Sequence, residues 1–302
     1  MRIATFNVQN LRLRLRDGQP ALDGAVDADM PDLPRSAALD IADRVETARI
    51  IAEADADIVA LQEVFDTAAL DFFHDNFLLP AGTTPYPHRV CLPGNDGRGL
   101  NVAALSRIAP EAIQSHAALI GADLGLDDLA AELRDYPLFR RDCLRLDFRE
   151  VSLFICHFKA PYPDPEKSRI VRHAEARGVR AVIEMAFERP EAERWIALGD
   201  FNEPARTGGA GTSALEPLKG GFAVDLMDRL PRGEDWTYET PDTHDHSRPD
   251  RFLVSPRLAR ELPEAIPRVL RAGMTPPTSI GQRPHASDHA LVFADFPGLD
   301  AA

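Results

Sequence analysis

Residues 195–204, "WIALGDFNEP", decide the fold of this chain. An apolar run climbs to Gly199 and is cut off by Asp200, Phe201 and Asn202. Apolar runs of this length with turn residues at their ends are typical of buried strands. The polar end has two interpretations: Gly, Asp and Asn all favour turns, or the strand aims a carboxylate and an amide at a substrate. The segment alone favours the turn at least as much as the site, so the rest of the chain has to decide.

The length and composition are those of a globular protein. The chain has 302 residues, of which 44% are hydrophobic and 27% charged, which is ordinary for a soluble domain. Its apolar stretches fall short of the roughly 20 residues that a membrane helix needs. The N-terminus, "MRIATFNVQN", lacks the apolar core of a signal peptide. We therefore expect a cytoplasmic monomer that does not insert into membranes.

Net charge and cysteine content restrict the partners. The formal net charge is −14, and duplex DNA binding relies on Lys and Arg to neutralise phosphates. A long nucleic acid is therefore a less favoured partner, whereas the acidic balance is compatible with cation binding. Cys91, Cys143 and Cys156 are far apart and odd in number, with neither zinc-ligand spacing nor a disulfide framework. We interpret all three as small core residues.

Strands and helices are interleaved along the whole chain. Apolar residues at close to helical spacing predict helices over 36–54, where Ser36 is a candidate cap, and over 166–189. Their expected core residues include Ile41 and Val45 in the first helix and Ile170 in the second. Apolar runs predict strands at 2–7, 58–61, 99–107, 143–148, 151–160, 195–199, 236–240, 251–255 and 290–296. This order predicts one α/β domain over 1–302 with a mixed sheet, and 10–35 is expected to be an inserted loop rich in Asp, Pro and Gly.

Side chains suited to metal binding or acid–base chemistry stand at many of these strand ends. They are Asn7, Glu63, His157, Asp200 and Asn202 after strands, and Asp250, Asp288 and His289 before strands. Each one alone has an ordinary explanation as a turn, surface or core residue. Turn chemistry does not predict such side chains at so many strand ends, and sites form where loops gather on a rigid scaffold. The pattern therefore predicts one site at the rim of the sheets.

The segments that carry these residues resemble the endonuclease/exonuclease/phosphatase superfamily of metal-dependent phosphoesterases. The matching segments, in the order of the family, are "TFNVQN" (5–10), "VALQEV" (59–64), "NVAALSR" (101–107), "CHFKAP" (156–161), "ALGDFNEP" (197–204), "RPDRFLVS" (248–255) and "SDHALVFADF" (287–296). The resemblance implies a DNase I-like, four-layer α/β sandwich of two stacked mixed sheets with helices on both outer faces. "RRDCLRLDF" (140–148) followed by "LFICHFKAP" (153–161) further resembles the bacterial nuclease-like branch.

The resemblance implies a metal-dependent hydrolase of phosphate esters, and above all a phosphodiesterase or nuclease acting on an ester that can belong to a nucleic acid. Hard oxygen ligands suit Mg²⁺, or alternatively Mn²⁺. Glu63 matches the principal metal ligand of the family, and Asn7 and Asp288 match residues in or beside the metal shell. Some members carry an Asp where this chain has Gln9, which leaves the number of metal ions open.

Catalytic roles follow from the same matches. In the family the residue matching Asp200 positions or deprotonates the attacking water, and the residue matching Asn202 hydrogen-bonds the phosphate. His289 matches the active-site histidine, acting either as a cation or as a general base, with Asp250 as the carboxylate that orients it. His157 matches a residue that stabilises the pentacovalent oxygens or helps to protonate the leaving group.

Three further residues are expected to contact the substrate: Arg98, Asn101 and Lys159. We also expect His157, Lys159 and His289 to supply positive charge locally. Two alternatives stay open, a phosphomonoesterase acting on a small phosphorylated substrate and a non-catalytic binding module on the same fold. The module is disfavoured because every matched position is occupied. The loop 243–247, "THDHS", contains two histidines, and we expect it to be solvated rather than a second metal site.

Overall fold

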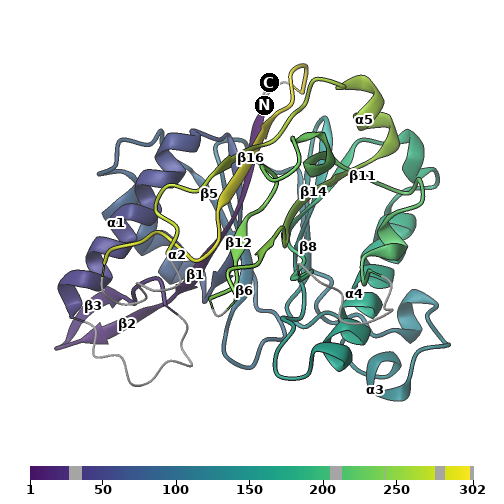
Figure 1. The fold of residues 1–302 in the computed structure, drawn as a ribbon, viewed down its shortest axis with the longest axis horizontal. Helices are drawn as coiled ribbons and strands as arrows, with labels where there is room; N and C mark the ends of the chain where they lie inside the picture. The colour runs from purple at the N-terminus through teal and green to yellow at the C-terminus, as the bar shows by residue number, and fades with distance from the viewer. Residues whose placement is uncertain (27–35, 205–212, 242, 276–282, 300–302) are drawn as a thin grey trace.

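Two mixed six-stranded sheets form the centre of the molecule (Figure 1). The computed structural model describes residues 1–26, 36–204, 213–241, 243–275 and 283–299. The first sheet has the order β15 (Arg268–Leu270), β16 (Leu291–Asp295), β1 (Arg2–Leu11), β4 (Ile58–Val64), β6 (Asn101–Ser106) and β5 (His88–Cys91). The second has the order β11 (Val224–Asp225), β14 (Asp250–Val254), β10 (Trp195–Asp200), β9 (Val151–His157), β8 (Cys143–Phe148) and β7 (Ala112–Gln114).

Apolar side chains from both sheets pack against each other in a shared core. Ile3 and Val102 of the first sheet belong to the same buried cluster as Leu198 and Phe252 of the second. Helices α1 (Ala37–Ala54) and α2 (Thr67–Phe73) cover the outer face of the first sheet, and α4 (Pro165–Ala186) covers that of the second. Figure 1 shows these helices on opposite sides of the paired sheets. The four-layer, DNase I-like arrangement expected from the sequence is confirmed.

The remaining elements are short. Helices α3 (Ala131–Arg134) and α5 (Pro256–Glu261) and the two-stranded pairs β2–β3 and β12–β13 lie outside the two main sheets. The bounds of these strands are Leu13–Arg16, Gln19–Leu22, Tyr238–Glu239 and His246–Ser247. Single helical turns cover His74–Leu78, Ala122–Leu124, Pro190–Ala192, Glu216–Leu218 and Leu226–Arg229. None of the helices in the described ranges is long and apolar enough to cross a bilayer.

Each sheet contains one parallel pair joined by a long helix, and this repeated unit positions the site. Strand β1 pairs in parallel with β4 across α1, and β9 pairs in parallel with β10 across α4. Both faces of these strands are covered, which explains why their sequences are apolar throughout. The regular parallel pairing ends at Asn7 opposite Gln62, the neighbour of Glu63, and at Asp200 opposite His157. Because parallel strands end on the same side, each pair delivers its two polar side chains to the rim together.

The N-terminal segment differs from the expected loop. Strand β1 runs on to Leu11, and β2 and β3 form an antiparallel hairpin within 10–35. Positions 27–35 lie outside the described residues. The alternating sequence "LRLRLR" (11–16) therefore forms strands, since it contains β2.

The two long helices begin and end close to the predicted positions, but their buried faces differ. Ser36 caps α1 by accepting the backbone N–H of Leu39 at 3.2 Å. Ile41 and Val45 are more than half exposed, contrary to prediction, whereas Arg44 is fully buried. The Arg44 guanidinium donates to five backbone carbonyls, those of Val8, Gln9, Asn10, Asp23 and Gly24. These carbonyls belong to the end of β1 and to the segment after β3, which the helix covers.

Helix α4 likewise buries charged residues. Ile170, predicted to face the core, is 48% exposed, and the buried face includes Arg172 and Glu175. Glu175 accepts the backbone N–H groups of Arg140 at 2.9 Å and Lys159 at 2.8 Å. The helix therefore carries a buried carboxylate that fixes two of the segments around the rim. All three cysteines are free and buried, as expected.

Candidate active site

Asn7 joins the two sheets at the rim where their strands end. Its side-chain Nδ2 donates to Asp200 Oδ2 at 3.1 Å and lies 3.4 Å from Glu63 Oε1. Its Oδ1 accepts the backbone N–H of Gln9 at 3.0 Å. The side-chain amide of Asn7 thus contacts Glu63, the predicted metal ligand of the first sheet, and Asp200, the carboxylate of the second sheet that is predicted to position the water.

The "GDFN" turn combines both interpretations of its sequence. Gly199 has φ +134°, and a Cβ there would lie 2.0 Å from the carbonyl oxygen of Cys156 on β9. Asp200 Oδ1 accepts the backbone N–H of Asn202 at 2.8 Å, and Asn202 takes a left-handed φ of +51°. Asn202 Nδ2 donates to the carbonyl of Phe158 at 3.0 Å. The turn therefore holds Asp200 in place, and its residues are turn formers at the same rim as the predicted site.

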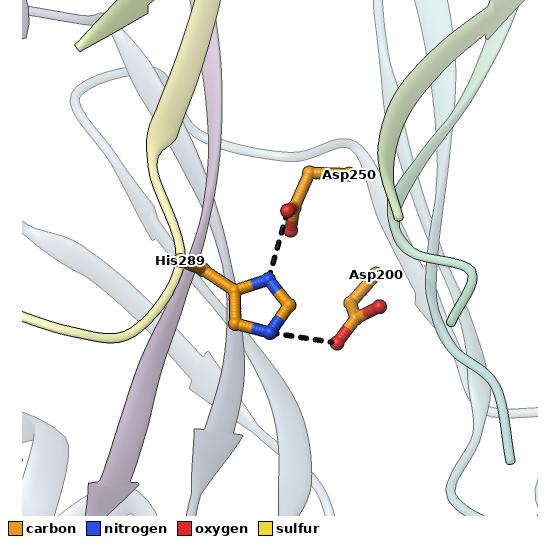
Figure 2. A group of neighbouring side chains, drawn as sticks. All are labelled: Asp200, Asp250 and His289. Atoms are coloured by element: carbon orange, nitrogen blue, oxygen red, sulfur yellow. Dashed lines mark hydrogen bonds and ion pairs between the residues drawn. The ribbon is translucent and has the colours of Figure 1, made fainter. Parts of the chain in front are cut away.

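His289 lies between two buried carboxylates (Figure 2). Its Nδ1 is 2.8 Å from Asp250 Oδ2, and its Nε2 is 3.8 Å from Asp200 Oδ2. Thr237 Oγ1 donates to the same Asp250 oxygen at 2.6 Å, and the ring of Tyr238 packs 5.0 Å from the His289 ring. Asp250 is thus an acceptor for two side chains, as a carboxylate that orients a histidine must be.

The charge of His289 follows from this setting. Burial alone would lower its pKa, but the carboxylates of Asp250, Asp200 and Asp288 outweigh burial and raise the pKa well above the ordinary value. Burial also raises the pKa of Asp200, although His289 opposes that shift. The geometry favours an imidazolium at His289 and a carboxylate at Asp200 that accepts protons more readily than an exposed one.

His157 is buried and its ring contacts the same carboxylate. Its Nε2 lies 3.5 Å from Asp200 Oδ2. Burial, together with the nearby charges of Arg141, His289 and Arg98, holds the pKa of His157 well below its ordinary value. A neutral ring does not supply the positive charge expected from the sequence. It can still donate an N–H from Nε2, which is the form that suits a hydrogen bond to Asp200 or to an oxygen of the substrate.

Oxygen-bearing side chains at the ends of β1 and β4 and ahead of β16 fit the predicted Mg²⁺ site. Asn7 Nδ2 and the backbone N–H of Asn10, at 3.4 and 3.0 Å, fix the two oxygens of the half-buried Glu63 carboxylate. Gln9 Oε1 accepts the backbone N–H of Asp288 at 3.2 Å, so it anchors the segment of the third predicted ligand. Carboxylate and amide oxygens are the ligands that Mg²⁺ prefers.

A second group of side chains is also compact enough to hold a metal ion. Among the described residues, ligand atoms of Asp200, Asp250 and His289 all lie within 4.8 Å of one another. Both nitrogens of His289 face carboxylates in this group, Nδ1 toward Asp250 at 2.8 Å and Nε2 toward Asp200 at 3.8 Å.

The three residues expected to contact substrate make different contacts. Arg98 is about half exposed and pairs with Asp96 at 3.1 Å. Asn101 is buried, and its amide binds the backbone N–H of Gly94 at 2.8 Å and the carbonyl of Phe65 at 2.7 Å. The structure therefore uses Asn101 to fix neighbouring loops.

Lys159 donates from Nζ to the carbonyls of Ala160, at 3.0 Å, and Tyr162. Burial and the charge of Arg141 lower the pKa of Lys159. Its ammonium group is directed at its own loop, so contact with a substrate would require it to turn.

Two residues near the site were missed in the sequence. Thr237 is fully buried against Asp250. It lies in "WTYET" (236–240), whose pattern predicts only a strand. Arg141 is buried, pairs with Asp96 at 3.1 Å and donates to the carbonyl of Phe158 at 3.1 Å. Its charge acts on both His157 and Lys159. The sequence "RRD" (140–142), directly before β8, could have indicated Arg141, since arginines next to a buried strand need acceptors such as carboxylates or carbonyls.

Comparison with known proteins agrees with this geometry. Residues 4–289 match the profile of the Endonuclease/Exonuclease/phosphatase family. Among solved structures, an endonuclease/exonuclease/phosphatase family protein from Leptotrichia buccalis is 16% identical, with 98% of each chain covered and a TM-score of 0.56. No curated protein matches the chain.

Two other solved structures cover nearly the whole chain. An AP endonuclease from Archaeoglobus fulgidus is 14% identical over 98% of this chain and 99% of its own, with a TM-score of 0.61. The 3′ phosphatase NExo from Neisseria, bound to a product DNA hairpin, is 19% identical over 98% and 99%, with a TM-score of 0.53. At these identities the likeness establishes a common fold.

Proposed function

The chain belongs to the endonuclease/exonuclease/phosphatase family of phosphoesterases, and we propose that it is a phosphodiesterase that depends on Mg²⁺ or Mn²⁺. The observation that carries the proposal is the chain of contacts from Glu63 through Asn7 to Asp200 and on to His289 and Asp250. A binding module would have no need to hold a histidine between two buried carboxylates, because burying such polar and charged groups is costly.

Glu63 would hold the cation, with Asn7 and Asp288 in or beside its shell. When bound, the cation polarises a phosphoryl oxygen and shields the charge of the leaving group. The number of ions is not part of the proposal.

The side chains around Asp200 divide the remaining work. Asp200, with its raised pKa and its Oδ1 fixed by the turn, holds the attacking water and accepts its proton. His289 contributes a positive charge to the phosphate, since a ring that is already protonated cannot act as the first base. Asp250 and Thr237 hold that ring in one orientation. His157 stabilises the oxygens of the transition state as a neutral donor. Asn202 stands at the same turn and orients the phosphate.

A substrate panel with Mg²⁺ and with Mn²⁺ tests the proposal. It should include a synthetic phosphodiester, a phosphomonoester, plasmid DNA, single-stranded DNA, RNA, inositol phosphates and sphingomyelin. Diester hydrolysis should stop with a chelator and return when either cation is added. Exclusive cleavage of the monoester would replace the proposed activity with that of a phosphomonoesterase, and full activity in chelated buffer would rule out metal dependence.

A pair of isosteric variants tests the assignment of the metal ligand. Glu63→Gln should raise the Mg²⁺ concentration needed for half-maximal activity and leave thermal stability nearly unchanged, because the change lies at the rim. Glu53→Gln is the matched control, since Glu53 is exposed on α1 and pairs with Arg49, another surface residue of the same helix, at 3.2 Å. An unchanged Mg²⁺ requirement in Glu63→Gln would show that the cation binds elsewhere.

A further inference from the structure

A buried ion pair joins helix α4 to the turn that follows β10. Arg172 of the helix is 1% exposed, and Glu203, which follows Asn202 in the chain, is 6% exposed. Arg172 Nε lies 3.7 Å from Glu203 Oε2, and neither atom has a hydrogen-bond partner among the described residues. Burial lowers the pKa of Arg172, and the charge of Glu203 is the largest influence that opposes this shift. Glu203 is therefore the main counter-charge of Arg172.

The path of the chain explains why a charged face of α4 meets the rim. The helix joins the parallel strands β9 and β10, so it runs back against their direction and its first turns lie near their carboxyl ends. Arg172 and Glu175 are three residues apart, which places them on one face of the helix, and both are buried. This face therefore meets the segments that follow the two strands.

Helix α4 holds the backbone of Lys159 on both sides. Arg172 Nη1 donates to the Lys159 carbonyl at 3.1 Å, and Glu175 Oε2 accepts the Lys159 N–H at 2.8 Å. Lys159 is two residues after His157, the last residue of β9. The helix thus fixes the chain directly after one of the proposed catalytic residues.

The turn after β10 is tied to the same segment. The N–H of Phe158 donates to the Asp200 carbonyl at 2.9 Å, and Asn202 Nδ2 donates to the Phe158 carbonyl at 3.0 Å. Glu203 ends this turn, and its Oε1 accepts the backbone N–H of Ala214 at 3.1 Å. The buried pair therefore closes a set of contacts between two segments that both carry catalytic side chains.

The cost of burial indicates that the pair serves geometry more than stability. Taking a guanidinium and a carboxylate out of water is costly, and apolar residues of similar size often give a protein that is equally stable or more stable. A separation of 3.7 Å, without a hydrogen bond between the charged atoms, offsets this cost only in part. What the pair does provide is one preferred position of the turn relative to the helix.

We propose that Arg172 and Glu203 are positioning residues of the catalytic site. They set the turn after β10 against the segment after β9, and so place Asp200, Asn202 and His157 relative to one another. The inference rests on the proposed phosphodiesterase activity and adds two residues to the machinery of that site. A displacement of about 1 Å at catalytic groups can lower a rate about 10²-fold, so residues that do not touch the substrate can control kcat.

Two variants and one control test this role. The double variant Arg172→Met/Glu203→Leu removes both charges and keeps their bulk, so its Tm should stay within about 4 °C of the parent value. Arg172→Lys keeps a charge for Glu203, but it lacks the spread of the guanidinium and cannot also hold the Lys159 carbonyl. The control, Arg177→Met/Asp128→Leu, removes a pair that joins the same helix to another segment at 2.7 and 2.8 Å.

Hydrogen exchange measures the positioning without catalysis. The backbone N–H groups of Phe158 and Asn202 donate to Asp200, and that of Lys159 donates to Glu175. Exchange of these three groups should become about ten-fold faster or more in both variants, while β4 in the first sheet and the control variant keep the parent rates. Parent rates at all three groups, or acceleration that spreads equally over the first sheet, would overturn the inference.

Steady-state kinetics with a synthetic phosphodiester separate positioning from substrate binding. In both variants kcat should fall about ten-fold or more, while KM and the Mg²⁺ requirement stay close to those of the parent and of the control. A parent-like kcat, or a rise in KM alone, would overturn the inference and leave the proposed function standing. Failure of the parent chain to hydrolyse any diester would reject the proposed function, and hydrogen exchange would still decide whether the pair positions the two segments.

Discussion

Replacing Gly199 by alanine should break the second sheet at its centre. A Cβ at this position would stand 2.0 Å from the Cys156 carbonyl oxygen, whereas real Cβ atoms essentially never come closer than 3.0 Å. The two strands would have to separate by at least 1.0 Å, the difference between these distances. Strands β8 and β14 flank β9 and β10 in the same sheet, so neither strand can move alone.

The expected cost has three parts. A non-glycine residue held at φ +134° costs about 1–3 kcal/mol, and overpacking a well-packed interior adds about 1–3 kcal/mol. Loss of one backbone hydrogen bond between the strands adds about 0.5–1.5 kcal/mol. Together these predict a loss of about 2.5–7.5 kcal/mol, against a typical total stability of about 5–15 kcal/mol.

Urea unfolding of three alanine variants separates the contributions. Gly97→Ala has open space and no positive φ, so the free energy of unfolding should stay close to that of the parent. Gly233→Ala has open space but φ +86°, so it should show the backbone cost alone. Gly199→Ala should lose several kcal/mol more than Gly233→Ala. A Gly199→Ala loss no larger than that of Gly233→Ala would refute the steric argument.

Three further results are expected. Asp250→Asn and His289→Ala should each lower kcat by about 10²–10⁴-fold, and the double variant should be little worse than the worse single variant. Additive losses in kcat would contradict the pairing of the two residues. Because the pKa of folded His157 lies below its ordinary 6.5, the unfolded chain takes up this proton first as pH falls, and stability is lost below about pH 6.5. His157→Gln should lessen that loss in urea unfolding at several pH values. An unchanged pH profile would show that the fold does not lower the pKa of His157. Because the protein has a net charge of −14, its surface should repel plasmid DNA, and a short diester should have the higher kcat/KM. This difference in kcat/KM should narrow as salt screens the repulsion. Efficient plasmid cleavage at low salt that falls steeply with added salt would show that the protein attracts DNA instead.

The central strands could be located from their apolar runs, whereas their arrangement in two stacked sheets was implied by the family resemblance. The predicted strand at 143–148 is β8 (Cys143–Phe148), and both of its sheet neighbours β9 and β7 are antiparallel to it. Edge strand β7 (Ala112–Gln114) was missed, since its three residues are exposed. A short exposed strand has no apolar pattern, and only its pairing with β8 defines it.

Apolar spacing predicted part of the buried face of each helix, such as Ile51 on α1 and Ile183 on α4, but it could not predict the charged residues buried beside them. Arg44 is buried because its guanidinium donates to backbone carbonyls at the end of β1 and in the segment after β3. Likewise Glu175 is buried because two N–H groups from separate segments meet beneath α4. Hydrophobic periodicity describes only the part of a helix that packs on apolar surface. The demand for these charged residues arises from segments distant in the sequence.

The sequence predicted polar side chains at one rim, and several of them lie close together there, but it could not predict their electrostatics. Residues at strand ends identify the rim, yet the charge of each histidine depends on its neighbours. His289 and His157 both approach Asp200 Oδ2, at 3.8 and 3.5 Å. Asp250 raises the pKa of the first ring, while burial and Arg141 lower that of the second. Two histidines near one carboxylate are therefore expected to be in opposite protonation states.

The same electrostatics give a reason for the metal that does not depend on the family. The carboxylates of Glu63, Asp200, Asp250 and Asp288 lie at a rim where the nearby cations are His289, Arg141 and Arg98. The two arginines also pair with Asp96, so these cations offset only part of the negative charge that a phosphate ester, itself an anion, meets. Burial raises the pKa of Asp200 and eases the imbalance, but protonating it would remove the proposed base. We infer that a divalent cation beside Glu63 would meet both requirements, because it would attract the phosphate and let Asp200 remain ionised.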